Sequence, residues 1–204
     1  MRIGVLAIQG SFILHIQSLQ RLGVETIEVR NREQLDEIDG LIMPGGESTT
    51  FGILFDKYNL GDSISKLVTD GLPVWGTCAG AIMLGRGTER PQPRLNLIDI
   101  DVIRNAYGRQ VDSFVTPIQI KGMDTGFQGV FIRAPKFFNP GLDVEILSDL
   151  NGEPIMARQA NVLISSFHPE LTPDSRVHQY FVNELCRPQG IGNGDAKPQS
   201  RVAS

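Results

Sequence analysis

The sequence contains one cysteine whose surroundings are typical of an enzymatic nucleophile. Cys78 lies in the sequence Gly-Thr-Cys-Ala-Gly, between the apolar segment 73–76 and the helix-like segment 79–84. Such a turn from strand to helix exposes the central side chain, and its small neighbours let the backbone pass close to a sheet. The start of a helix also favours the thiolate, and its N–H groups can stabilise an oxyanion. We therefore predict a nucleophile, although a structural cysteine in a glycine-rich turn would give the same pattern.

A cysteine nucleophile needs a base within hydrogen-bond reach, and the base needs a partner that orients it. His168 follows the apolar segment 162–167, so we place it at the carboxyl end of a strand, where open α/β sheets hold their active sites. Glu170 is two residues further on, and in an extended segment these two side chains project the same way. We predict a catalytic triad of Cys78, His168 and Glu170; a surface histidine beside a solvated carboxylate is the alternative.

The other histidines and the other cysteine are weaker candidates. His15 and His178 lie in the first and last predicted helices, where a histidine is more often a packed or surface residue than a base. Cys186 is expected to be a small packing residue at the end of the last helix. No disulfide framework, CxxC pair, H-x-x-H pair or carboxylate cluster is apparent, so we expect no metal site.

A second glycine-rich turn, Pro-Gly-Gly-Glu-Ser-Thr-Thr at 44–50, follows the apolar segment 41–43. Its glycines allow a backbone N–H to turn toward developing negative charge, while Glu47 and Ser48 offer polar groups for an amide or ammonium. We predict an oxyanion and substrate loop, and a turn in which Ser48 or Thr49 caps a helix is compatible with it. The loop is not a phosphate loop of the GxxxxGK[ST] type.

These residues require a scaffold of alternating strands and helices. In the first half, strands are predicted at 2–8, 26–29, 41–43 and 73–76, and helices at 12–22, 32–38, 49–55, 62–70 and 79–84. In the second half, short β-rich segments are predicted at 97–103, 111–120, 129–133, 144–147, 154–158 and 162–167, before a closing helix at 174–185. This order predicts an α/β fold with a doubly wound, mostly parallel sheet to which antiparallel hairpins are added.

Composition narrows the class of protein further. The chain has 204 residues, 41% of them hydrophobic and 21% charged, which fits one globular domain at 1–186. The Gly-, Pro- and Ser-rich segment 187–204 is predicted to be a disordered tail. A net charge of −4 argues against a nucleic-acid surface. The apolar segment at the N-terminus is too short to cross a bilayer, so we expect a cytoplasmic protein that does not act at a membrane.

Taken together, the motifs GTCAG, PGGEST and Ser-Phe-His-Pro-Glu at 166–170 resemble those of class I, triad-type glutamine amidotransferases. The segments LAIQG at 6–10, PGGESTT at 44–50, RNAYGRQ at 104–110 and SFHPELT at 166–172 are similar to those of the glutaminase subunits of pyridoxal 5'-phosphate synthases. The resemblance covers about residues 2–185. It implies a flavodoxin-like class I glutaminase fold.

The resemblance implies a reaction as well as a fold. Cys78 would attack the carboxamide of L-glutamine to form a thioester, His168 would protonate the departing ammonia and activate water, and Glu170 would orient His168. The residues that it implies for glutamine binding are Gly46, Glu47, Ser48, Arg104, Ile132 and Arg133.

The resemblance also implies how the reaction is controlled. The N–H groups of Gly46 and Ala79 would form the oxyanion hole, and the turn Gln9-Gly10 is linked in this family to its formation when the synthase docks. Low activity of the isolated chain is therefore expected. Ammonia would pass to a (β/α)₈-barrel synthase subunit, and no cofactor is expected on this chain.

Three other functions remain open at this point. A class I glutaminase of another synthase, such as that of the histidine pathway, is disfavoured by RNAYGRQ and PGGEST. A DJ-1-like protein or cysteine peptidase is disfavoured by Ala79, since the peptidase branch usually has histidine after its nucleophile. A regulatory binding module without turnover would usually lack a triad residue, and all three are present here.

Overall fold

The computed structural model describes residues 1–47, 55, 60–87, 94–104 and 113–187. Most of the predicted helix 49–55, Ser48, the segment 105–112 and the predicted tail beyond Arg187 lie outside these residues.

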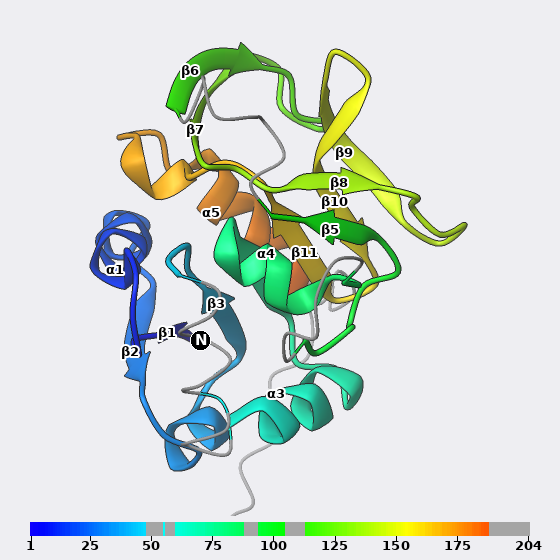
Figure 1. Ribbon diagram of the computed structural model, residues 1–204. Helices are drawn as coiled ribbons and strands as arrows, with labels where there is room; N and C mark the ends of the chain where they lie inside the picture. The colour runs from blue at the N-terminus through cyan, green and yellow to red at the C-terminus, as the bar shows by residue number, and fades with distance from the viewer. Residues whose placement is uncertain (48–54, 56–59, 88–93, 105–112, 188–204) are drawn as a thin grey trace, which may run out of the picture.

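A mostly parallel sheet of seven strands forms the centre of the molecule (Figure 1), with the order β2-β1-β3-β4-β11-β10-β9. Its parallel strands are β2 (Glu25–Val29), β1 (Arg2–Leu6), β3 (Gly40–Met43), β4 (Val74–Thr77) and β11 (Val162–Ser165). The strands β10 (Glu153–Gln159) and β9 (Glu145–Leu150) extend it antiparallel. The α/β fold with a mostly parallel sheet is therefore confirmed.

Helices cover both faces of this sheet. On one face, α3 (Leu60–Thr69) and α4 (Ala79–Leu84) pack against apolar side chains that include Leu41, Met43 and Ile164. On the other face, α1 (Phe12–Arg21) and α5 (Arg176–Tyr180) pack on a second core that contains Trp75. The π-helical segment η3 (Phe181–Cys186) continues α5. A 3₁₀ turn η1 (Glu33–Glu37) leads into β3. Coverage on both faces explains why the inner strands β1, β3, β4 and β11 are mostly apolar.

The second half of the chain departs from the prediction in three places. The pairs β5 (Asp101–Ile103) with β8 (Lys136–Phe138) and β6 (Ser113–Ile118) with β7 (Phe127–Ile132) form separate two-stranded sheets and do not join the central one. The strand predicted at 97–103 is limited to its last three residues, because the N–H groups of Leu97 and Ile98 bond the carbonyl of Leu84 at the end of α4. The closing helix begins at Arg176, where its backbone N–H donates to Asp174 Oδ1 at 3.0 Å.

The topology brings distant segments to one edge of the sheet. Because β1, β3, β4 and β11 are adjacent and parallel, the residues that follow their carboxyl ends meet there. These residues are Gln9 and Gly10 after β1, Gly45 to Glu47 after β3, Cys78 after β4, and His168 after β11.

Candidate active site

Cys78 occupies a strained turn between β4 and α4. Its φ of 49° and ψ of −102° are unusual for a residue with a side chain. Its N–H donates to the carbonyl of Ser165 at 2.9 Å, and its own carbonyl accepts from the N–H of Ile82 at 3.1 Å. The turn is therefore held by β11 on one side and by α4 on the other. A Cβ on Gly80 would lie 2.0 Å from the carbonyl oxygen of Met43, so the backbone passes β3 too closely for any side chain. The geometry is that of a nucleophile elbow.

His168 and Glu170 lie directly beside this cysteine. Nδ1 of His168 is 2.8 Å from Oε1 of Glu170, and the imidazole lies close enough to Cys78 for the thiol to influence its pKa. His168 and Cys78 are 8% and 7% exposed, while Glu170 is buried. The structure brings the three predicted residues together, but not through the extended segment that we expected. The segment is not extended, because residues Pro169–Leu171 form the 3₁₀ turn η2, and this turn carries the carboxylate back to the imidazole.

The charges of this group depend on one another. Burial lowers the pKa of His168, but hydrogen bonds to Cys78 and Glu170 and their charges outweigh it and raise the pKa to about 10. Burial raises the pKa of Glu170, yet His15, the hydrogen bond from His168 and that from Ser11 lower it to about 2. At neutral pH the arrangement therefore favours an imidazolium held by a carboxylate, as a Cys–His pair requires.

Two partners of Glu170 escaped the sequence analysis. Ser11 Oγ donates to Glu170 Oε1 at 2.5 Å, and His15 Nε2 lies 3.4 Å from Oε2. Ser11 is at the N-cap position of α1, but its side chain makes no cap hydrogen bond. His15 was judged a packing residue, and it is buried, but it faces the carboxylate. The sequence offers no signal for these contacts, because Ser11 and Glu170 are 159 positions apart in the chain.

A pocket opens in front of Cys78 and contains most of the residues predicted to bind substrate. It is lined by Gly46, Glu47, Cys78, Ala79, Ile82, Arg104, Ile132, Arg133 and His168. Arg104 Nη2 donates to Glu47 Oε1 at 2.5 Å across its mouth. The carbonyl of Ile132 lies 3.9 Å from Cys78 Sγ, so the end of β7 covers the thiol. Arg133 has a positive φ of 44° at the same place.

The turn Gln9-Gly10 contacts the second glycine-rich loop. Gln9 Nε2 donates to the carbonyl of Glu47 at 2.6 Å, and its Oε1 accepts the N–H of Glu47 at 3.2 Å. The carbonyl of Gly45 accepts from Ser11 N–H at 3.4 Å. Since a trans peptide points its C=O and N–H in opposite directions, the N–H of Gly46 is directed away from that turn. Gly10, at φ 82°, has no room for a side chain, because its Cβ would lie 1.8 Å from Gly45 O.

The remaining cysteine differs from Cys78 in its environment. Cys186 lies at the end of η3 and packs over Gly40, where a Cβ would lie 2.6 Å from its sulfur. Burial and the nearby Asp39 raise the pKa of its thiol to about 12. Both cysteines are free. Within the described part of the chain, no group of three His, Cys, Asp or Glu side chains could hold a metal ion.

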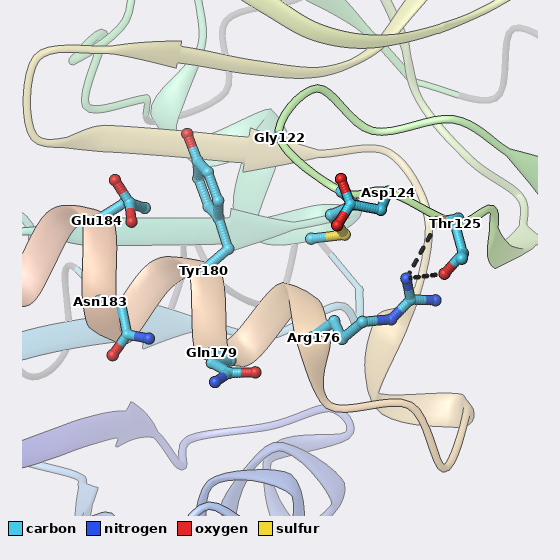
Figure 2. Close-up of a pocket in the computed structure, with 9 residues that line it drawn as sticks. Gly122, Asp124, Thr125, Arg176, Gln179, Tyr180, Asn183 and Glu184 are labelled. Atoms are coloured by element: carbon cyan, nitrogen blue, oxygen red, sulfur yellow. Dashed lines mark hydrogen bonds between the residues drawn. The ribbon is translucent and has the colours of Figure 1, made fainter.

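A second pocket lies away from the triad, between the β6–β7 turn and the closing helix (Figure 2). Its lining includes Gly122, Asp124, Gln179 and Tyr180. Arg176 reaches from α5 to Thr125, where Nη1 donates to Oγ1 at 2.7 Å and to the carbonyl at 3.0 Å. Arg176 also pairs with Asp174 at 2.6 Å. These contacts tie the hairpin to the helix.

Comparison with known proteins decides the family. The sequence profile described as the SNO glutamine amidotransferase family matches residues 5–187. The chain belongs to this family. Among similar relatives of this amidotransferase, the pyridoxal 5'-phosphate synthase subunit PdxT of Carboxydothermus hydrogenoformans is 49% identical over 92% of the chain and 99% of its own length. PdxT of Corynebacterium jeikeium is 50% identical over 94% of the chain and 100% of its own length.

Solved structures agree with the fold of this amidotransferase. A crystal structure described as a glutamine amidotransferase superposes with a TM-score of 0.86 at 50% identity, covering 90% of this chain and 98% of the other. The structure of PurLQS from Thermotoga maritima has a TM-score of 0.66 at 19% identity, with 90% of this chain and 98% of that chain covered. At that identity the second similarity concerns the fold alone. None of the helices in the described ranges is both long and apolar enough to span a membrane.

Proposed function

We propose that this chain is the glutaminase subunit of a pyridoxal 5'-phosphate synthase. It hydrolyses L-glutamine to L-glutamate and ammonia and supplies the ammonia to a synthase subunit. One observation carries the proposal: the strained Cys78 lies against His168, whose imidazole is held by a buried Glu170, at the bottom of an open pocket. The PdxT relatives, about half identical over nearly their whole length, supply the pathway.

The first half-reaction forms a thioester. The Cys78 thiolate attacks the side-chain carbonyl carbon of glutamine, and the negative charge moves to the oxygen. We propose that the N–H groups of Ala79 and Gly46 hold this oxyanion. His168 then gives its proton to the amide nitrogen, the carbon–nitrogen bond breaks, and ammonia leaves. A γ-glutamyl thioester on Cys78 and a neutral imidazole remain.

The second half-reaction hydrolyses the thioester. Neutral His168 takes a proton from water as the water oxygen attacks the thioester carbon. The carbon–sulfur bond breaks, glutamate forms, and the Cys78 thiolate with its imidazolium partner is restored. Throughout both steps Glu170 fixes the orientation of His168 and stabilises its positive form, which accounts for its depth in the protein.

The pocket residues fit the α-amino and α-carboxylate groups of glutamine. Arg104 and Arg133 bring positive charge to the mouth, where an arginine would bind the α-carboxylate through a charge-assisted pair. Glu47 brings a carboxylate suited to the α-ammonium, and it is already paired with Arg104. Ser48 is part of the proposal by its place in the sequence, since it lies outside the described residues.

We propose that the partner is a (β/α)₈-barrel synthase subunit, which receives the ammonia. The turn Gln9-Gly10 is the proposed point of control, since it hydrogen-bonds the loop that carries Gly46. A change in this turn when the synthase docks would turn the N–H of Gly46 toward the oxyanion. Without the synthase that N–H would not face the oxyanion, so the chain alone should have low activity. We propose that the reaction takes place in the cytoplasm. One domain at 1–186 carries it out, and it needs no cofactor on this chain.

Glutamate release from glutamine tests this proposal. We expect the chain alone to be slow, strong stimulation by its cognate synthase subunit, and no release by Cys78→Ala in either setting. The loss should exceed about 10³-fold, as for other covalent catalytic residues. Cys186→Ala is the matched control and should keep wild-type activity. Ample activity without any response to the synthase would favour a glutaminase of another pathway, and no activity in a complex shown to form would favour a silent binding module.

A further inference from the structure

Two buried histidines lie behind the proposed triad. His15 on α1 and His178 on α5 are fully buried, and Nδ1 of His15 is 2.9 Å from Nε2 of His178. On its other side, Nε2 of His15 lies 3.4 Å from Oε2 of Glu170 and 3.3 Å from Oγ1 of Thr77. Thr77 immediately precedes Cys78. One imidazole therefore touches both the strand that presents the nucleophile and the carboxylate behind the base.

The surroundings of this pair select one tautomer. Nε2 of His15 faces a carboxylate, which would repel a lone pair, so this nitrogen carries the hydrogen. Nδ1 of His15 then accepts from Nε2–H of His178. That leaves Nδ1 of His178 as a bare nitrogen, and this buried atom has no hydrogen-bond partner among the described residues. An unpaired buried acceptor is tolerated better than an unpaired buried N–H. At the other end, Oε2 of Glu170 is also buried without a hydrogen-bond partner among the described residues, and Nε2 of His15 faces it at 3.4 Å.

We infer that His15 is a positioning residue for Glu170: its Nε2–H faces Oε2 at 3.4 Å, while Ser11 and His168 bond Oε1, and His178 fixes the orientation of His15. The hydrogen bonds hold Oε1, and the N–H of His15 faces the otherwise unpartnered Oε2, which favours the orientation of the carboxylate toward His168. The effect on rate rests on the glutaminase function proposed above; the hydrogen-bond arrangement does not.

His15 acts as a neutral donor and not as a charge. The ionisable groups that face it are Glu170, His168 and His178, and Arg21 adds its charge near His178. Burial lowers the pKa of His15, and the charge of His168 adds to this effect against the opposing effect of Glu170. At neutral pH its contribution to Glu170 is therefore the dipole of an N–H bond. The donor should persist unchanged across the working pH range.

Nuclear magnetic resonance of the wild-type protein tests the arrangement directly. The chain has three histidines, so the imidazole nitrogens of a ¹⁵N-labelled sample can be assigned with few variants. We expect His15 and His178 to be neutral and protonated at Nε2 near pH 7.5. A proton on Nδ1 of His15, or an imidazolium at that position, would overturn the inference.

Two variants then test the consequence. His15→Leu removes the donor and keeps an apolar side chain, and should lower kcat for glutamate release in the synthase complex by about 10- to 100-fold, as small misplacements of catalytic groups do. KM for glutamine should stay the same, because His15 does not line the pocket. His15→Gln places an amide N–H near the position of Nε2 and should recover most of the rate. Equal loss in both variants, with both folded, would indicate packing alone and refute the inference.

A third measurement separates this inference from the proposed function. Alkylation of Cys78 by iodoacetamide against pH reports the thiolate–imidazolium pair without glutamine. We expect its acid limb to move to higher pH in His15→Leu and to return in His15→Gln. An unchanged profile in His15→Leu would contradict the inference. If the wild-type complex releases no glutamate, the proposed function fails, while the tautomers and the alkylation profiles still decide the role of His15.

Discussion

At the scale of single residues, the proposed site depends on one buried carboxylate. Glu170 Oε1 receives hydrogen bonds from His168 and Ser11 at 2.8 and 2.5 Å, and Oε2 faces His15. A buried charge is costly unless it is fully compensated. The pKa of about 2 for Glu170 and about 10 for His168 express this compensation, since His15, His168 and Ser11 stabilise the charged form of Glu170, and Glu170 stabilises that of His168.

This coupling predicts how stability depends on pH. The pKa of Glu170 is lowered, so its stabilising effect is present above about pH 4.5 and is lost as the pH falls toward 2. The pKa of His168 is raised, so its effect is present below about pH 6.5 and is lost as the pH rises toward 10. We expect Glu170→Gln to lower the free energy of unfolding at pH 7 by on the order of 3 kcal/mol and to flatten both limbs.

Urea unfolding from pH 3 to pH 10 measures this effect. The control is Glu33→Gln, which changes an exposed carboxylate on η1 and should keep the wild-type pH profile. If the free energy of unfolding of Glu170→Gln changed with pH as steeply as that of the wild type, the carboxylate would not be the source of the pH dependence.

At the scale of elements, the junction of β4 and α4 is the most constrained part of the fold. A Cβ on Gly76 would lie 2.5 Å from the backbone of Gly80, and one on Gly80 would lie 2.0 Å from the backbone of Met43. Neither neighbour is a flexible side chain, so neither can move aside cheaply. Because α4 passes so close to β3 and β4, Cys78 is presented at the edge of the sheet.

Substitution of these glycines should therefore destabilise the fold despite improving helix propensity. We expect Gly80→Ala to lower the free energy of unfolding by about 2 kcal/mol or more, because overpacking outweighs the gain of about 1 kcal/mol for alanine in a helix. Gly61→Ala, also in a helix, is the matched control. A Cβ on Gly61 would lie no closer than 3.6 Å to any neighbour, so the free energy of unfolding should stay the same or rise slightly. Equal urea midpoints for the two variants would contradict this account.

Periodicity predicted the elements that are long or buried and missed those that depend on distant partners. The segment predicted as helix at 79–84 agrees with α4, since small residues follow a strand there. The segment 97–100 was expected to be a strand because it is apolar. Ile98 and Ile100 are indeed buried, but they pack on the end of α4 without pairing. Three-residue β8 was missed, because it is too short for a periodic pattern and is paired only with distant β5.

The candidate site shows the same limit. Cys78, His168 and Glu170 could be predicted because each follows a recognisable strand or lies close to another site residue in sequence. Ser11 and His15 could not, since their roles arise from the packing of α1 against η2, for which the sequence of α1 carries no signal. Sequence patterns report neighbours along the chain, whereas burial reports neighbours in space.

At the scale of the whole molecule, two cores on opposite faces of one sheet must form together. The core on the α1 and α5 face includes Trp75, which lies 5.0 Å from the His178 ring and 5.7 Å from the Phe181 ring. Phe181 belongs to the closing segment η3, so the last helical residues complete the core behind the proposed site. The face carrying α3 and α4 has its own core around Met83.

Removal of the Phe181 ring should therefore weaken the entire fold. We expect Phe181→Ala to lower the free energy of unfolding by about 3 to 5 kcal/mol, the usual cost of a large cavity in a core. Leu142→Ala, at a fully exposed side chain, is the control and should change it by less than about 0.5 kcal/mol. Thermal or urea unfolding measures both. A small effect at Phe181 would mean that the closing segment contributes little to the core.

The position of β11 also has a consequence for biosynthesis. It is the last strand of the described chain to leave the ribosome, yet it lies inside the sheet between β4 and β10. Until it emerges, β4 is an open edge with Val74 and Trp75 exposed to other chains, a surface that invites aggregation. Cys78 gains its imidazole partner only when β11 inserts. The nascent protein therefore carries an unfinished sheet, and the proposed nucleophile lacks its base, until β11 has been synthesised.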